Sequence, residues 1–223
     1  MRIGINTGNA LLAQRDPATG TLHGIAVDLA RALADRVAEP ANLVAYDSAA
    51  RMADDAKRDA WDAAFLAADA ARAQDITFTE PYLEIEATYL VPAGSTLASL
   101  EDVDRPDVRI AVSDRSAYDL ALKRTITRAQ LVGAPNVDAS VDLFFAKKLE
   151  ALAGLKPLLV EVAHSHQQCR VLDGRFTAIQ QAIGIPAGRD TAAFDAFVRD
   201  VKSSGLVARL IDQHHIRGVT AAR

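Results

Sequence analysis

Two short stretches, RIGIN at residues 2–6 and RIAVS at residues 109–113, decide the fold of this chain. Each contains Arg-Ile, a small residue, an apolar residue and a polar residue, and each opens into a loop followed by a helical pattern. The segments WDAAFLA (61–67) and LEALAGL (149–155) share a second pattern, an acid after a large apolar residue and then small apolar positions. Because both patterns occur in the same order in each half, the sequence predicts two similar α/β lobes.

The segments between these patterns predict alternating strands and helices. IAVDLARALADRV (25–37) is an expected helix, because its large apolar residues recur at four-residue spacing. Residues 41–47 are an expected strand, 48–60 a polar helix, and the Gly- and Asn-punctuated stretch 7–24 a loop. Runs that are apolar on both faces favour a mixed, mostly parallel sheet flanked by helices in each lobe.

The order of the patterns also predicts the domain organisation. The β-rich runs at 85–94 and 175–188 are interpreted as two crossings between the lobes, which makes a two-strand hinge. We therefore expect lobe 1 to comprise residues 1–88 with 181–223, and lobe 2 residues 89–180. Two helices, around 190–205 and 206–216, are expected to close the chain.

Composition limits the function. The chain has 223 residues, 50% of them hydrophobic, and a formal net charge of -4, which argues against a nucleic-acid surface. The single cysteine, Cys169, is expected to be a buried thiol, and four of the five histidines lie in close pairs without a metal-ligand pattern. No nucleophile elbow or phosphate-binding loop occurs, so we expect no catalytic residue, metal or cofactor.

The sequence also bears on the compartment. It has no apolar run of 18 residues, which excludes a membrane-spanning helix. No charged and then apolar leader precedes RIGIN. We therefore expect either the processed form of an exported protein or a protein that stays in the cytoplasm.

Two longer stretches resemble a known family. TGTLHGIAVDLARALADRV (19–37) is similar to the G-x-G-F-D-x-D-L-A-x-A signature of the extracytoplasmic solute-binding proteins of ABC transporters, amino-acid-binding family 3. WDAAFLAADAARAQDITFTEPY (61–82) resembles that family's pattern of an arginine followed by F-S-x-P-Y. Asp28, Arg72, Phe78, Pro81 and Tyr82 carry the likeness, in that order. The resemblance implies the type II periplasmic binding protein fold, in which two lobes close over a ligand.

The resemblance assigns a role to Arg72, which stands in a run of alanines. In the family this arginine grips the carboxylate of the ligand, and a guanidinium suits that role because it is planar, donates two parallel hydrogen bonds and stays charged. The alternative is a solvated arginine on a short helix, paired with Asp69 or Asp75.

Other site residues follow from the same resemblance. Ser116 keeps one hydroxyl of the family's G-T-T, Asn9 stands where the family has a stacking aromatic, and Ala67 stands where it has a serine or threonine. In the family, an acid near the position of Leu155 binds the ammonium group of the ligand. This chain has no carboxylate at that position, so the ligand class stays open between an amino acid and a related organic acid. Phe65 is interpreted either as a pocket wall or as core. Neutral hydrogen-bonding groups could come from Asn6, Asn9, Tyr118, Gln180 and Gln181.

The function implied by the resemblance is solute binding. We expect a monomeric, periplasmic, substrate-binding component of an ABC-type importer, which captures a small carboxylated solute by hinge closure and presents it to a membrane permease. One alternative is a lyase of the cyclohexadienyl dehydratase type, with Glu80, Glu84 or Glu86 as the acid. Another is an orphan ligand sensor inside the cell.

Overall fold

The computed structural model describes residues 1–222, and the chain divides into two compact units. Unit 1 comprises Met1–Glu84 and Gln180–Arg223, and unit 2 comprises Ile85–Ile179. Two ten-residue strands, β7 (Leu83–Pro92) and β12 (Thr177–Pro186), contain the boundaries between the units. The hinge and the lobe boundaries expected from the sequence stay predictions.

The sheet of unit 1 has the order β4-β1-β5-β12, in which β4, β1 and β5 are parallel and β12 is antiparallel. Its strands are β1 (Arg2–Asn6), β4 (Asn42–Tyr46), β5 (Ala63–Ala67) and part of β12, with β6 (Ile76–Phe78) paired to β12 and β13 (Val219–Ala221) paired to β7. All five residues of β5 are buried, as expected for a strand covered on both faces.

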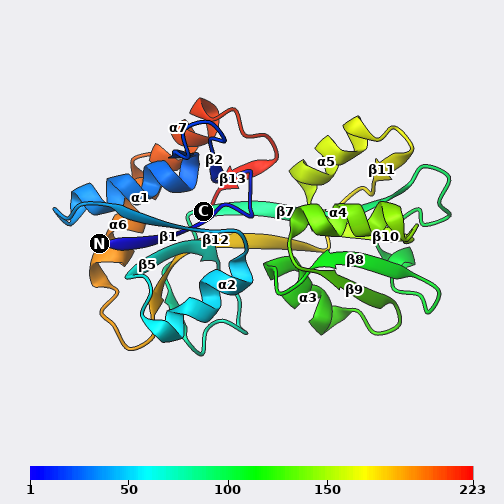
Figure 1. Cartoon of the computed structure of the whole chain (residues 1–223), viewed down its shortest axis with the longest axis horizontal. Coiled ribbons are helices and arrows are strands. Elements are labelled where there is room, and N and C mark those ends of the chain that lie inside the picture. Colours follow the sequence, from blue (N-terminus) through cyan, green and yellow to red (C-terminus); the bar gives the residue numbers. More distant parts are fainter. Residues whose placement is uncertain (223) are drawn as a thin grey trace. The chain divides into compact units, whose positions relative to one another are not determined.

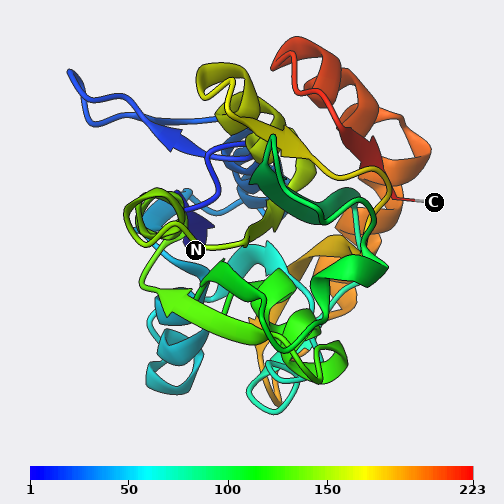
Figure 2. The same ribbon diagram turned by 90° about the vertical axis from the view of Figure 1, so that its right-hand side faces the viewer.

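Helices cover both faces of this sheet (Figure 1). The helix α1 (Ile25–Arg36) buries Ile25, Leu29 and Leu33, and it packs against α6 (Ala192–Ser203) and α7 (Leu206–Gln213). Figure 2 shows α6 and α7 side by side. On the other side, α2 (Ala49–Asp54) contributes to a core cluster around Trp61, whose Nε1 donates to the carbonyl of Met52.

Unit 2 repeats this arrangement. Its sheet has the order β9-β8-β10-β7, with the first three strands parallel and β7 antiparallel. Its elements are β8 (Arg109–Ser113), α3 (Ala117–Thr125), β9 (Gln130–Ala134), α4 (Val137–Ala146), β10 (Ala151–Leu155), α5 (Lys156–Ser165) and β11 (Cys169–Val171), after a 3₁₀ turn at Glu101–Val103. The predicted fold class, two similar α/β units with mostly parallel sheets, is confirmed.

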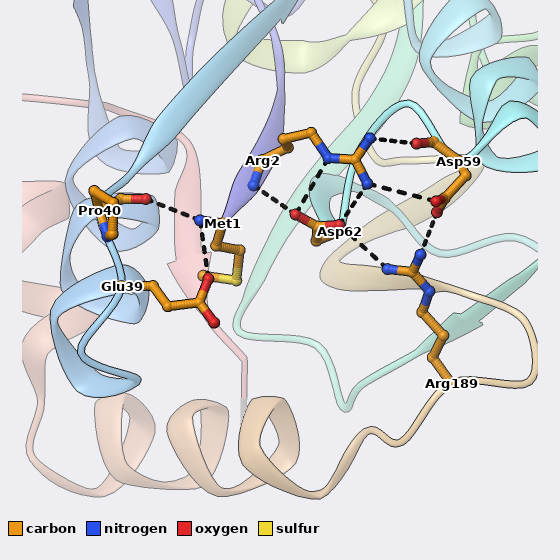
Figure 3. Close-up of polar contacts among 7 residues, drawn as sticks. All are labelled: Met1, Arg2, Glu39, Pro40, Asp59, Asp62 and Arg189. Atoms are coloured by element: carbon orange, nitrogen blue, oxygen red, sulfur yellow. Dashed lines mark hydrogen bonds and ion pairs between the residues drawn. The ribbon is translucent and has the colours of Figure 1, made fainter.

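One ion pair marks the repeat at the start of each central strand. Asp62 accepts from the backbone N–H of Arg2 at 2.7 Å and from its Nη2 at 2.6 Å (Figure 3). Glu150 accepts from the backbone N–H of Arg109 and from its Nη2, both at 2.8 Å. The registers also agree, because Ile3 lies opposite Ala63 and Ile110 lies opposite Ala151. We call these two contacts the arginine–carboxylate ties.

A turn with a left-handed residue precedes each acid. Asp59 has a φ of 54° and Lys148 a φ of 48°, and each offers its carbonyl to the arginine of the tie. In unit 1, Arg189 also contacts Asp59 and Asp62 (Figure 3). A bidentate arginine–carboxylate contact is geometrically specific, so the ties hold the amino ends of neighbouring parallel strands level with one another.

Some sequence predictions are wrong in detail. The stretch 7–24 is not a plain loop, because it contains a short hairpin of β2 (Gln14–Arg15) and β3 (Leu22–His23). The polar helix expected over 48–60 ends at Asp54 and continues as a 3₁₀ turn, Asp55–Arg58. Cys169 is only partly buried, because it lies on the short strand β11. Among residues 1–222, no helix combines the length and apolar character needed to span a membrane.

The tie in unit 1 makes a pH-dependent contribution to stability. The hydrogen bonds from the Arg2 side chain, followed by smaller effects of its backbone N–H and of Arg189, lower the pKa of Asp62 to about 2. An unfolded aspartate has a pKa of about 3.9. The stabilisation is therefore present above pH about 4 and is lost as the pH falls through about 2.

We predict that Asp62→Asn lowers the free energy of unfolding at pH 7 by about 1–3 kcal/mol, because it removes charge-assisted hydrogen bonds. Urea denaturation from pH 7 to pH 2.5 should show the difference from the wild type shrinking as the pH falls. Asp35→Asn, on the exposed face of α1, is the matched control and should show no such loss. An equal loss at every pH would contradict the assignment of this contribution to the carboxylate.

Candidate functional site

The candidate residues of unit 1 lie beyond the carboxyl ends of two neighbouring strands. β1 and β5 are parallel, with Ile5 opposite Phe65, so the loops that follow them leave the sheet at the same edge. In parallel α/β sheets, ligands bind outside the carboxyl ends of the strands. We call Asn6, Asn9, Ala67 and Arg72 the unit 1 edge.

Arg72 is held in a turn between β5 and β6. Its backbone N–H donates to the carbonyl of Asp69 at 3.0 Å, and its own carbonyl accepts from Ile76 at 3.1 Å. The side chain is folded back so that Nη1 donates to the carbonyl of Ala67 at 2.7 Å, and only 6% of the residue is exposed. The interpretation of Arg72 as a solvated arginine on a short helix is therefore wrong, because the residue is buried and lies in a turn.

Two asparagines follow β1 at the same edge. Asn6 Oδ1 accepts from the backbone N–H of Gly8 at 3.1 Å, which stabilises the turn. Asn9 is buried, with 8% exposed, and its Oδ1 has no hydrogen-bond partner among residues 1–222. A buried carbonyl oxygen without a donor costs about 1–3 kcal/mol, so Asn9 is an acceptor that a donor group would satisfy.

Phe65 and Tyr82 lie in the core beside this edge. Their rings meet edge to face with centroids 5.7 Å apart, and they are 2% and 1% exposed. Burial raises the pKa of Tyr82, whose hydroxyl has no partner within the described chain. Of the two interpretations of Phe65, core packing agrees with its burial.

Gln180 and its neighbour Gln181 lie on β12. Gln180 Nε2 donates to Glu84 Oε2 at 2.8 Å, so its amide is engaged within unit 1. Gln181 is buried, and its backbone carbonyl accepts from the N–H of Tyr82. The side chain of Gln180 thus has a partner on β7, and the backbone of Gln181 joins β12 to Tyr82.

In unit 2, the corresponding strands β8 and β10 are parallel and carry the remaining candidates. Ser116 caps α3, and its Oγ accepts from the N–H of Asp119 at 3.1 Å. Arg115, which the resemblance places at the glycine of the family's G-T-T, has a φ of 54°, a left-handed conformation that glycine adopts more easily. Burial raises the pKa of Tyr118 to about 12, and only 4% of this residue is exposed.

The end of β10 is the position for which the resemblance implies an acid. Leu155 is buried there, with 6% exposed, and α5 begins at the next residue, Lys156. A carboxylate is nevertheless nearby, because Glu86 on β7 pairs with Lys156 at 2.9 Å. Sequence reasoning missed this pair, and only the lysine next to Leu155 hinted at it. We call Arg115, Ser116, Leu155 and Lys156 the unit 2 edge.

His214 and His166 make structural contacts. His214 Nε2 lies 2.7 Å from Asp28 Oδ2, which joins the end of α7 to the first turn of α1. His166 stacks on Phe145 with ring centroids 4.4 Å apart. Within residues 1–222, no group of three or more His, Cys, Asp or Glu side chains is placed to hold a metal ion.

The sequence profile of the bacterial extracellular solute-binding proteins, family 3, matches residues 1–216. The chain belongs to this family. No curated protein sequence matches this family member.

Solved structures similar to this family 3 chain have the same fold. An amino acid ABC transporter substrate-binding protein from Streptococcus pneumoniae, bound to L-arginine, is 17% identical with a TM-score of 0.80 and covers 96% of this chain and 93% of its own. A Salmonella typhimurium periplasmic binding protein with high arginine specificity is 15% identical with a TM-score of 0.80, covering 96% and 97%. An ancestral amino acid-binding protein, a precursor of cyclohexadienyl dehydratase, is 19% identical with a TM-score of 0.80, covering 96% and 93%. These likenesses establish the type II periplasmic binding protein fold.

The hydroxyl of Tyr82 supports a prediction about stability. Tyr82→Phe should leave the free energy of unfolding unchanged or raise it by about 1 kcal/mol, because a buried group without a partner is removed. The matched control is Tyr46→Phe, which loses the hydrogen bond from Tyr46 Oη to Asp55 at 3.0 Å and should destabilise by about 1 kcal/mol. Urea denaturation of both variants checks the difference, and a larger loss for Tyr82→Phe would contradict it.

Proposed function

We propose that this family 3 protein is the substrate-binding component of an ABC-type importer and binds a small carboxylated solute, an amino acid or a related organic acid. Arg72 is the observation that carries the proposal. It is a buried guanidinium at the carboxyl ends of parallel strands, in a chain whose family is described as extracellular and solute-binding. By the same family membership, we propose the periplasm as the compartment and a membrane permease as the partner.

The geometry of Arg72 suits a carboxylate. The bond from Nη1 to the carbonyl of Ala67 holds the guanidinium in place, so less side-chain entropy is lost when a ligand binds. Arginine stays charged when it is buried, and its fork matches the two oxygens of a carboxylate. Asn9 Oδ1, at the same edge, would accept a hydrogen bond from an N–H or O–H group of the solute.

We propose Ser116 as a second donor to the solute. It lies at the N-terminus of α3, where backbone N–H groups and the helix dipole favour an anion. A solute that binds one conformation of the protein more tightly than the others shifts the population toward that conformation. In this proposal the permease distinguishes the liganded conformation from the empty protein.

The three glutamates considered for a lyase have other contacts. Glu80 pairs with Lys202 at 3.2 Å, Glu84 accepts from Gln180, and Glu86 pairs with Lys156. Each contact gives its carboxylate a structural role, and no contact favours a lyase over solute binding.

We predict that Arg72→Ala weakens binding of the solute by at least about 100-fold, because a buried charge partner of the carboxylate is lost. A thermal-shift screen of amino acids, keto acids and hydroxy acids identifies the solute. At a hundred times its dissociation constant, a true ligand should raise the melting temperature by roughly 5–10 °C.

Two further variants separate binding from folding. Arg72→Lys keeps the positive charge but loses the two parallel N–H donors of the guanidinium. This variant should bind the solute at least about tenfold more weakly than the wild type. Arg199→Ala, on the exposed side of α6, is the control and should bind like the wild type. Unchanged affinity in a folded Arg72→Ala protein would overturn the assignment of the carboxylate site.

A further inference from the structure

Gln181 is a glutamine of β12 whose side-chain amide has no hydrogen-bond partner among residues 1–222. Only 5% of the residue is exposed. Its neighbour Gln180 differs, because Gln180 Nε2 donates to Glu84 Oε2 at 2.8 Å. A polar side chain at a largely buried position usually bonds another group of the protein. The contacts within unit 1 therefore do not explain a glutamine at position 181.

The register of β12 on β5 places this amide. Gln181 lies opposite Ala67 in an antiparallel pair, and the next pair on the same face is Ile183 opposite Phe65. Directly opposite residues point to the same face of a sheet, with Cβ atoms about 4.5–5.5 Å apart. The side chain of Gln181 therefore stands beside Ala67 at the carboxyl end of β5, on the face of the sheet that carries Phe65.

Arg72 is bound to the same alanine. Its Nη1 donates to the carbonyl of Ala67 at 2.7 Å, while Gln181 stands beside the methyl group of that residue. A methyl group is too short to screen one of these side chains from the other. All three residues belong to unit 1. A guanidinium and a neutral amide are thus brought to one alanine from two distant parts of the sequence.

The amide of Gln181 can be reached by a solute. In the described chain, the fully buried side-chain polar atoms that lack a partner are Asn9 Oδ1, Tyr82 Oη and Asp119 Oδ1. The amide atoms of Gln181 also lack a partner but do not belong to this group, so the exposed part of the residue includes its amide. The backbone carbonyl of Gln181 accepts from the N–H of Tyr82 at 2.9 Å. The amide is therefore presented from a strand whose backbone is held in place.

We infer that Gln181 is a solute-binding residue, which bonds a polar group on the carbon atom next to the carboxylate that Arg72 binds. The inference rests on the proposed function and deepens it, since it names the solute as a 2-substituted carboxylate, that is, a 2-amino, 2-hydroxy or 2-oxo acid. A primary amide has two donors and an acceptor oxygen, so it can bond each of these groups. An unsubstituted acid displaces water from the amide and gives it no partner in return, which weakens binding.

Isothermal titration calorimetry with matched probes tests the inference. Four series carry the side chains of leucine, phenylalanine, glutamate and lysine, so that apolar, aromatic, acidic and basic solutes are all sampled. Each series comprises the 2-amino, the 2-hydroxy, the 2-oxo and the unsubstituted acid. In a series whose side chain is accepted, at least one substituted acid should bind at least about tenfold more tightly than the unsubstituted acid. The preferred substituent shows whether the amide donates, as to an oxo group, or accepts, as from an ammonium.

Two variants locate this preference. Gln181→Met keeps the length of the side chain but removes the amide, and it should reduce the preference to less than about threefold without weakening the unsubstituted acid. Gln213→Met, at the exposed end of α7 in the same unit, is the matched control and should keep the wild-type preference. Urea denaturation without a probe should show that Gln181→Met does not lower the free energy of unfolding, because no hydrogen bond within the protein is lost.

The outcomes separate the two proposals. If the unsubstituted acids bind as tightly as the substituted ones, with loss of binding in Arg72→Ala, the inference about Gln181 is wrong and the proposed function stands. The same conclusion follows if Gln181→Met keeps the wild-type preference or weakens all four acids of a series equally. If no probe and no compound of the thermal-shift screen binds, the proposed function and the inference both fail.

Discussion

The arginine–carboxylate ties determine where the rest of each unit lies. In each unit an arginine opens the central strand and is bound through its backbone and its guanidinium to an acid that precedes the neighbouring strand. A slip of one residue would break these bonds and turn every side chain of the strand to the opposite face. The ties therefore set the register of the parallel strands and, with it, the edge at which the following loops emerge.

The two edges that result differ in chemistry. The unit 1 edge carries one buried guanidinium and a buried acceptor, Arg72 and Asn9. The unit 2 edge carries the N-termini of α3 and α5 and the lysine that shares Glu86 with Arg175. Similar backbones thus present different charges, because the repeat constrains the buried strands and leaves the loop residues free to vary.

Much of the fold could be predicted because its signals are local. The four-residue spacing of α1 and the apolar run of β5 are visible in the sequence, and the repeated Arg-Ile starts predicted two similar units. The hairpin of β2 and β3 was missed, since two-residue strands leave almost no pattern. The predicted helix over 48–60 was too long, because the chain tightens into a 3₁₀ turn after Asp54 and this turn ends at Asp59 in a left-handed conformation.

The sequence by itself determined the fold class and the order in which the strand and helix patterns follow one another. It also determined Arg72 as a candidate ligand-binding residue and the lack of an acid at Leu155. Each of these follows from residue type and short-range spacing. Only the tertiary structure decided which charges meet. Glu86 and Lys156 are 70 residues apart and Asp28 and His214 are 186 apart, yet each pair lies within 3 Å. Such contacts depend on the packing of whole elements, which no local pattern encodes. The burial of Arg72 was decided in the same way, because the turn between β5 and β6 folds its guanidinium back onto Ala67.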